Sequence, residues 1–295
     1  RSLIAGSPLR DGEGQRAGRQ HSLSCLHRRL AWARAAPKGP SSAGPVGLKR
    51  TAWGETRTAQ VLSLADRLDS VAAFFYVGLV PTGSEDPFAL RRNTTAIVRI
   101  ILEGNLRIDV GSYIDTARNL VIGDGFKGDR DSVQEGRRRM TEFIFERVRH
   151  YGRVVHALRD DVIEAVLKPA YGSKMLDLVD LVLRMKALES VTTKPEFDPL
   201  IVGFKRAHRL VEKEQWDRKP VDNTRFEHIT ESALYQAVAE EREKMLSAMN
   251  RGEYGRALDA LVRLKPVIDA FFTAVMVNAE DPAIRSNRLS LLREV

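Results

Sequence analysis

Cysteine and long apolar runs are scarce in this 295-residue chain, and each scarcity excludes a class of protein. The single cysteine, Cys25, cannot form an intramolecular disulfide, so the sequence predicts a reducing, cytoplasmic location. No run approaches the ~20 consecutive apolar residues that a membrane-spanning helix needs. The first residues also lack the apolar segment of a signal peptide, so none is expected. The composition favours a globular protein of up to two domains.

Residues with the spacing of a catalytic or metal site are scarce as well. The six histidines show no H-x-x-x-H spacing, and no His-Asp dipeptide occurs. Residues 124–131, DGFKGDRD, do not fit a calcium-binding loop and indicate a turn. Asp66 and Asp69 lie three residues apart, where a salt-bridged helix face with Arg67 is commoner than a metal site. The sequence therefore predicts no catalytic residue and no metal site in this chain.

The excess of positive over negative charge is confined to the first fifth of the chain. Residues 1–57 hold 11 Lys and Arg against 3 Asp and Glu, which accounts for the whole formal net charge of +8. Any nucleic-acid site in the remainder must then be a local patch. Residues 1–55 are also rich in Gly, Pro and Ser, and they predict a disordered or non-native basic leader. A basic RNA-binding arm is the alternative.

From Thr56 onward the apolar residues follow helical spacing. The stripe from Val61 to Phe75 predicts a first helix, and the apolar residues from Phe88 to Leu102 predict a second, ended by Gly104. Further helices are expected at about 131–151, 159–168, 173–190, 196–215, 224–250 and 254–276. No segment has the alternation of a strand, so the predicted fold is all-α.

The segment between the first two expected helices resembles a phosphate loop. Residues 81–84 read PTGS and lead directly into a helix start, where a bound anion needs free backbone N–H groups. Two carboxylates follow instead, and the lysine of a P-loop is absent. Asp86 and Pro87 predict a helix N-cap and its first residue, so the loop positions a helix.

Basic clusters are the candidate RNA-binding surfaces. One candidate is the pair Arg91 and Arg92, which could reach a backbone phosphate. Two arginines that are merely solvated are the commoner arrangement for such a pair. Residues 203–213 place Lys205, Arg206 and Arg209 on one expected helix. Residues 136–153 combine arginines with aromatic residues: Arg137, Arg138, Arg139, Arg147, Arg149, Arg153, Phe143, Phe145 and Tyr151. Such faces suit phosphates and unstacked bases. A charged outer face over aromatics in the core is the alternative, and periodicity alone slightly favours it.

Several stretches in order resemble one family, the β subunit of the bacterial heterotetrameric glycyl-tRNA synthetase. They are LADRLDSVAAFFYVGLVPTGSEDPFALRR, FIFERVRHY, DVIEAVL, FKRAHRL and LKPVIDAFFTAVMVNAEDPAIRSNRLSLL. The resemblance covers about Thr56 to Arg293 and only the C-terminal portion of that longer subunit.

The resemblance implies a domain order and a function. It implies a partial HD-like helical domain at 56–120, a helical connector at 121–189 and an anticodon-binding domain of the arginyl-tRNA-synthetase type at 190–290. The family's enzyme is an α2β2 tetramer of the bacterial cytoplasm that joins glycine to its tRNA. ATP and Mg²⁺ act on the α subunit, so this chain is expected to hold no cofactor, to be non-catalytic alone, and to bind neither membrane nor DNA.

The resemblance also assigns the candidate residues. It favours tRNA contacts for Lys205, Arg206 and Arg209, supported by Arg147, Arg149, Arg91 and Arg92. Asp66 matches the last aspartate of an HD-type metal site, but the His-Asp pair of such a site is absent, so Asp66 is a lone remnant. Two alternatives stay open: a helical module for subunit assembly only, and a remnant metal phosphohydrolase.

Overall fold

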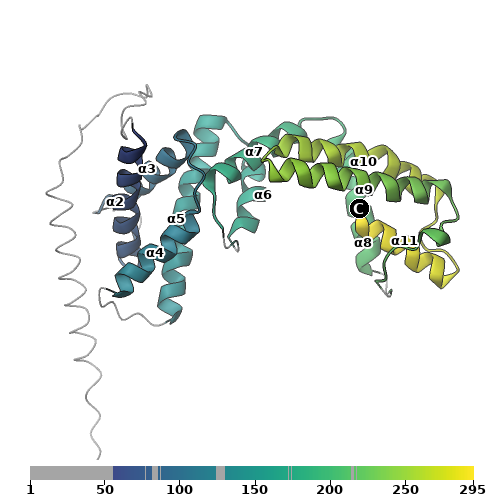
Figure 1. Cartoon of the computed structure of the whole chain (residues 1–295), viewed down its shortest axis with the longest axis horizontal. Coiled ribbons are helices and arrows are strands. Elements are labelled where there is room, and N and C mark those ends of the chain that lie inside the picture. Colours follow the sequence, from purple (N-terminus) through teal and green to yellow (C-terminus); the bar gives the residue numbers. More distant parts are fainter. Residues whose placement is uncertain are drawn as a thin grey trace, which may run out of the picture. The chain divides into compact units, whose positions relative to one another are not determined.

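The computed structural model describes residues 56–76, 78–81, 86, 88–123, 130–171, 173, 175–213, 216 and 218–295, with the backbone alone at 121–123 and 130–133. Over these residues the regular elements are helices, with no strand, which confirms the predicted all-α fold (Figure 1). None of the described helices has the length and apolar character to cross a membrane. The expected leader at 1–55, Cys25 and most of the PTGS loop lie outside the described residues.

The chain divides into two compact units, which are described separately. Unit 1 extends to Leu181 and unit 2 begins at Val182. The elements of unit 1 are α2 (Arg57–Tyr76), α3 (Leu90–Glu103), α4 (Val110–Gly123), α5 (Arg130–His156) and α6 (Asp160–Ala170), and the division falls within α7 (Leu178–Thr192).

Unit 1 is built around α2 and the long helix α5. Helix α2 packs against α3, α4 and α5, while α5 also contacts α3 and α6. Its core contains fully buried side chains from four helices, such as Val71, Ile97, Ile114 and Ile144. At Gly136, a Cβ atom would lie 2.8 Å from Cδ1 of Tyr76. Only glycine therefore allows α5 to approach α2 this closely.

Helix α3 begins later than the sequence indicates. Its first residue is Leu90, and the N-cap is Ala89, with a left-handed φ of 54° and no capping side chain. Asp86 nevertheless caps the helix, because its carboxylate accepts from the backbone N–H groups of Leu90 at 2.7 Å and Arg91 at 3.0 Å. The predicted start directly after Asp86 is thus wrong in position, while Pro87 lies outside the described residues. A carboxylate at this helix end already satisfies the donors that an anion would use.

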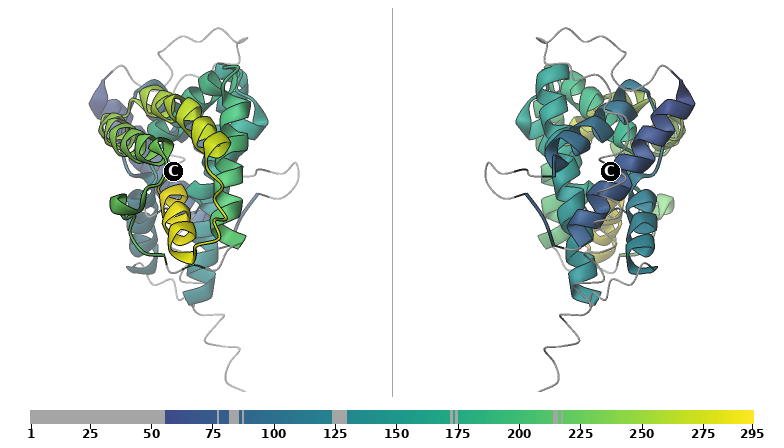
Figure 2. Two further views of the ribbon diagram at one scale, coloured as in Figure 1. Left: turned by 90° about the vertical axis from the view of Figure 1, so that its right-hand side faces the viewer. Right: turned by 90° about the vertical axis from the view of Figure 1, so that its left-hand side faces the viewer.

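Unit 2 is a helical bundle whose longest helices form an antiparallel pair. Its further elements are α8 (Phe197–Lys213), the 3₁₀ helix η1 (Asn223–Arg225), α9 (Ile229–Asn250), α10 (Tyr254–Ala274) and α11 (Pro282–Glu294). A three-residue turn joins α9 to α10, with Gly252 at a φ of 71°. Helices α8 and α11 pack against this pair and against each other (Figures 1 and 2). Leu234, Leu264, Phe271 and Leu291 are among the buried residues of the shared core.

Two helices have no counterpart in the helix spans expected from periodicity. Helix α4 begins Val-Gly-Ser, and its buried residues Val110, Ile114 and Ala117 follow helical spacing over two turns only. Helix α11 buries the polar residues Asn287, Arg288 and Ser290 after Ile284 and beside its leucines, so the apolar spacing is interrupted. Periodicity thus carries a short signal for α4, whereas α11 is stabilised by tertiary contacts that periodicity does not detect.

Candidate nucleic-acid interface

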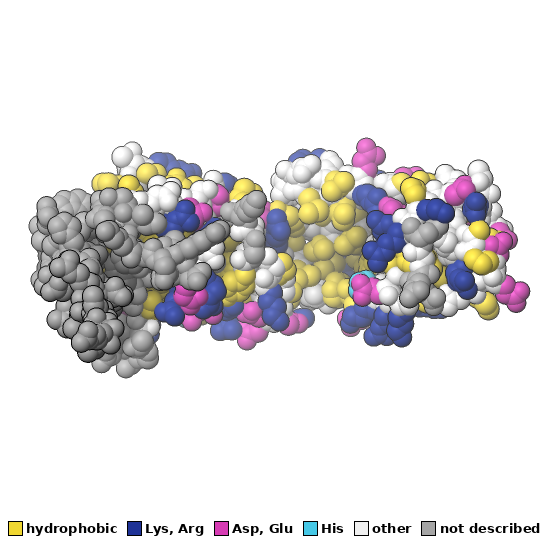
Figure 3. Space-filling view, turned by 90° about the horizontal axis from the view of Figure 1, so that it is seen from below, with side chains coloured by type: hydrophobic (Ala, Val, Ile, Leu, Met, Phe, Trp, Pro, Cys, Tyr) yellow, Lys and Arg dark blue, Asp and Glu magenta, His cyan; other side chains and the backbone are white. Residues whose placement is uncertain are grey.

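Helix α8 has one face in the core of unit 2 and one in solvent. Leu200 and Ala207 are buried, whereas Lys205, Arg206 and Arg209 are exposed. Lys205 and Arg209 lie four residues apart and form no ion pair with any residue that the structure describes. Figure 3 shows Lys and Arg side chains gathered on the part of unit 2 where α8 lies, next to apolar side chains. These cations are therefore available to an external anion.

A groove of 940 Å³ runs between this face of α8 and the segment that ends α10. We call it the α8 groove. The residues that line it are Val202, Lys205, Arg206, Arg209, Leu210, Lys213, Phe272, Thr273, Ala274, Val275, Met276, Val277 and Asn278. This set contains four cationic side chains and no carboxylate. The groove is thus positively charged within the described part of the chain, and it favours a polyanion.

An aromatic ring lies inside the α8 groove. The guanidinium carbon of Arg206 is 4.2 Å from the ring centroid of Phe272, a cation–π contact. Beyond Phe272 the chain leaves α10 in an extended conformation, with Val275 at φ −118° and ψ 124°. Val275 and Val277 are buried and Met276 is exposed, as expected for alternating side chains of an extended segment.

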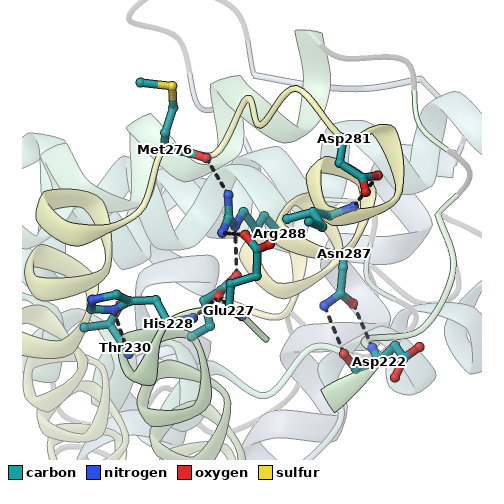
Figure 4. A network of polar contacts seen from close by, with 10 residues as sticks. Asp222, Glu227, His228, Thr230, Met276, Asp281, Asn287 and Arg288 are labelled. Carbon is teal, nitrogen blue, oxygen red and sulfur yellow. Dashed lines mark hydrogen bonds and ion pairs between the residues drawn. The ribbon is translucent and has the colours of Figure 1, made fainter. Parts of the chain in front are cut away.

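A buried arginine holds this extended wall in place. Arg288 on α11 donates to the backbone carbonyl of Met276 at 3.0 Å, to Glu231 at 2.8 Å and to Glu227 at 2.9 Å. In Figure 4 the carbonyl of Met276 is turned toward Arg288, while its side chain extends the opposite way. Arg288 therefore connects α11, the start of α9 and one wall of the α8 groove.

Two polar residues near Arg288 hold other parts of unit 2: Asn287 binds the segment before η1, and Asp281 caps α11. Asn287 accepts from the backbone N–H of Asp222 at 2.8 Å and donates to its carbonyl at 3.0 Å (Figure 4). Asp281 is the N-cap of α11 and accepts from the N–H of Ala283 at 2.7 Å, followed by Pro282. Residues 280–289 thus contain the N-cap of α11 at Asp281 and two residues, Asn287 and Arg288, that bind backbone groups of other segments.

The arginine cluster of 136–153 is arranged differently, because carboxylates already pair with its cations. Arg149 donates to Glu164 and, at 3.0 Å, to the hydroxyl of Tyr171. The hydrogen bond from Arg149 lowers the pKa of Glu164, although burial opposes this shift, and the bond to Glu164 raises the pKa of Arg149. Arg147 lies 4.8 Å over the ring of Phe143 and 3.4 Å from Glu146.

The other arginines of this cluster are paired too. Their partners are Asp115 for Arg137, Glu135 for Arg138 and Arg139, and Asp160 for Arg153. Phe143 and Phe145 are buried, so the aromatics of this cluster belong to the core of unit 1, and Tyr151 is half-buried. Contacts of Arg147 and Arg149 with RNA stay predictions.

The remaining candidates lie on α2 and α3. Arg92 is exposed and has no partner among the described residues, whereas Arg91 is half-buried. Asp66 is exposed on α2. Among the described residues, no group of three or more His, Cys, Asp or Glu side chains is arranged to hold a metal ion.

Sequence reasoning missed several residues of the α8 groove: Val202, Lys213, Phe272, Met276 and Asn278. Phe272 follows Phe271, which is fully buried. Adjacent residues of a helix point in different directions, so the apolar stripe explains Phe271 but not Phe272. The adjacent Phe-Phe pair could therefore have indicated that Phe272 lies outside the core. The distance along the chain from Arg206 to Phe272 hid their contact.

Comparison with known proteins defines the class. Residues 200–295 match the family model of the DALR anticodon binding domain, which covers almost all of α8 and the whole opposite wall of the groove. Residues 47–168 match the model of the glycyl-tRNA synthetase beta subunit. That match begins nine residues before Thr56, inside the expected leader. The chain belongs to the glycyl-tRNA synthetase β subunit family.

Individual relatives agree with this assignment. The chain is 33% identical over 252 residues to the glycine–tRNA ligase β subunit of Citrifermentans bemidjiense, covering 83% of this chain and 34% of the relative. It is 36% identical over 248 residues to that of Geobacter metallireducens, with coverage of 83% and 34%. The subunit of Xanthomonas campestris is 35% identical over 240 residues, with coverage of 80% and 33%. The chain therefore spans about a third of the length of these relatives.

Proposed function

We propose that this chain is the tRNA-recognition part of a glycine–tRNA ligase β subunit and that it binds the anticodon arm of the tRNA for glycine in the α8 groove. The observation that carries the proposal is the lining of that groove, with four cations and no carboxylate among described residues. It lies within the segment that matches an anticodon-binding domain.

The groove supplies the electrostatic part of binding. Lys205 and Arg209 are exposed, share one helix face and have no competing ion pair with described residues. We assign them to backbone phosphates, which orient the RNA without selecting its sequence. Selection of the glycine anticodon then requires contacts to bases.

The rest of the proposed function concerns the whole enzyme. In an α2β2 tetramer of the bacterial cytoplasm, this chain would hold the tRNA while its acceptor end reaches the α subunit. The α subunit would carry ATP, Mg²⁺ and the catalytic residues, so this chain alone is non-catalytic. Arg92, exposed at the start of α3, supports a contact with the acceptor arm, and Arg91 beside it is part of the same proposal.

The test is a binding titration of the full chain with the tRNA for glycine and with the same tRNA carrying two exchanged anticodon bases. The proposal predicts tighter binding of the native tRNA. It also predicts that the double variant Lys205→Ala, Arg209→Ala weakens binding at least about tenfold, since two charge-assisted hydrogen bonds are lost.

The matched control is Arg256→Ala. Arg256 is an exposed cation of unit 2 at the opposite end of α10, about 24 Å along the helix from Phe272 at 1.5 Å per residue. Its removal leaves the affinity unchanged if the groove is the site. A full chain that is folded and binds neither tRNA would favour the alternative of a subunit-assembly module. The side chains of Val61 and Leu62, 62% and 69% exposed on α2, would then be the first surface to examine.

A further inference from the structure

Arg206 differs from the two cations beside it on α8, because an aromatic ring already covers one side of its guanidinium. The Cζ atom lies 4.2 Å from the centroid of Phe272, and no ion pair joins Arg206 to a described residue. The side chain is otherwise exposed in the α8 groove. Arg206 therefore presents a second, uncovered side to whatever occupies the groove.

Phe272 is held by the core of unit 2, and its ring orients the guanidinium of Arg206 through the cation–π contact. Phe272 is half-buried and packs against the core cluster. The preceding residue, Phe271, is fully buried; the two ring centroids are 5.6 Å apart and the ring planes form an angle of 68°. On α8, the residue after Arg206 is the buried Ala207 of the same cluster. The ring and the guanidinium therefore form a preorganised platform, which lowers the entropy lost when a ligand stacks on it.

The groove also exposes apolar side chains that phosphates do not need. Val202, one turn before Arg206 on α8, is 66% exposed, and Met276 on the opposite wall is 77% exposed. Exposed apolar groups inside a basic groove indicate a ligand with both a charged and an apolar part. A nucleotide whose base is not paired has this composition, with a phosphate on one side and a flat, weakly polar base on the other.

We propose that Arg206 and Phe272 bind one unpaired nucleobase by stacking, while Lys205 and Arg209 bind the phosphates beside it. The inference rests on the proposed function, and it gives Arg206 a different role from the backbone contact predicted from the sequence. A stacked base covers the outer side of the guanidinium and the nearby apolar groups. A duplex or an acidic peptide would supply anions to the groove but would leave these groups in water.

The experiment uses the full chain and the anticodon stem-loop RNA of the tRNA for glycine. A set of RNAs has one loop base at a time replaced by an abasic site. Two variants remove the platform without removing charge: Phe272→Leu removes the ring, and Arg206→Lys keeps the cation but removes the planar group. Phe272→Leu could disturb the core, whereas Arg206 is exposed and Arg206→Lys leaves the core intact. Arg206→Lys therefore tests the platform even if Phe272→Leu affects folding. Arg256→Ala is the control.

The expected result has three parts. Each platform variant weakens binding of the intact RNA by about 5- to 150-fold, the range for loss of one stacked base. The salt dependence of binding is unchanged, because no charge is lost. One of the abasic RNAs, which lacks the stacked base, binds the wild-type chain more weakly than the intact RNA by a similar factor. Phe272→Leu and Arg206→Lys do not weaken the binding of this RNA further.

Other results overturn the inference, and they differ from those that overturn the proposed function. If the wild-type chain binds the intact RNA and both variants bind it equally well, the platform is not used. The same conclusion follows if the variants weaken every abasic RNA by the same factor. If an oligoglutamate peptide displaces the RNA at equal phosphate and carboxylate concentration, the groove is an unselective anion site. If the wild-type chain does not bind the RNA at all, the proposed function fails.

Discussion

Arg288 donates from Nε to Oε1 of Glu231 at 2.8 Å, with side chains that are only 9% and 1% exposed. A buried pair of this kind requires additional hydrogen bonds to offset its desolvation. Arg288 obtains them from Glu227 and the carbonyl of Met276, while the second carboxylate oxygen of Glu231 accepts from the backbone N–H groups of Glu227 and His228, both at 2.8 Å. The two side chains thus join three backbone segments of unit 2.

Replacement of Arg288 by Met is expected to lower the free energy of unfolding of unit 2 by about 3–5 kcal/mol, because Glu231 is left buried without its cation. The measurement is urea unfolding followed by Trp216, which packs on the core of unit 2. Trp32 and Trp53 are replaced by Phe so that Trp216 is the single tryptophan, excited selectively over the tyrosines. Arg293→Met, an exposed arginine of the same helix, is the control. A loss below about 1 kcal/mol at Arg288 would contradict the assigned role.

A second prediction concerns Asn287, an uncharged residue whose hydrogen bonds are expected to stabilise unit 2. Asn287→Ala removes both hydrogen bonds to the backbone of Asp222 and is expected to destabilise unit 2 by about 2 kcal/mol. Asn287→Asp is expected to cost at least as much, because a carboxylate cannot donate to the carbonyl. The same Trp216 measurement applies. Equal unfolding midpoints for wild type and both variants would show that water replaces these bonds.

Glu241 predicts a pH dependence for the α9–α10 pair. It is buried on α9 and accepts from Arg263 of α10 at 2.9 Å and from Lys244 at 2.7 Å. The hydrogen bond from Arg263 is the main reason that the pKa of Glu241 lies below its ordinary value of 4.5, and burial opposes it. A lowered pKa in the folded state means that the stabilisation is complete above pH 4.5 and is lost as the pH falls through the folded-state pKa.

Glu241→Gln is therefore expected to cost about 1 kcal/mol at pH 7, a value that allows for the half-exposed Arg263. The cost shrinks below pH 4.5 and vanishes once the folded-state carboxyl is protonated. Thermal unfolding from pH 3 to pH 7 measures it, with the exposed Glu243→Gln as control. A cost that is constant over this pH range would contradict the ionic origin of the contact.

Asp86 is expected to stabilise the start of α3 in unit 1. Asp86→Ala removes the acceptor of the Leu90 and Arg91 amides and costs about 0.5–2 kcal/mol locally. Hydrogen exchange measured by NMR should show faster exchange at these two amides, with no change in unit 2. Asp86→Asn, which retains one side-chain oxygen, should show a smaller effect. Unchanged exchange in Asp86→Ala would mean that Asp86 is not the cap.

The sequence predicts most of the fold because most helices have an apolar stripe and a clear end. The helix from Val61 to Phe75 is found as α2, and Gly104 is the C-cap of α3 as predicted. Helix α11 could not be predicted from periodicity, since Asn287 and Arg288 are buried there by partners 65 and 57 residues away. Such contacts depend on the tertiary structure, and a local sequence pattern does not reveal them.

The candidate site is predictable in part. The face of α8 with Lys205 and Arg209 follows from their spacing of four residues, and the structure shows both side chains exposed. The opposite wall was hidden, because Phe272 and Met276 reach the groove only through the end of α10 and a short extended segment. The charge pattern of Arg147 and Arg149 does not reveal that Glu146 and Glu164 pair with them.

The most direct test of the central claim is the salt dependence of tRNA binding. The dissociation constant of the full chain for the tRNA for glycine is measured over a range of KCl concentrations, for wild type, Lys205→Ala with Arg209→Ala, and Arg256→Ala. If both groove cations contact phosphates, the slope of log Kd against log salt falls by about 1.4–1.8 in the double variant and stays unchanged in Arg256→Ala. An equal slope in all three proteins would show that the α8 groove does not hold the tRNA.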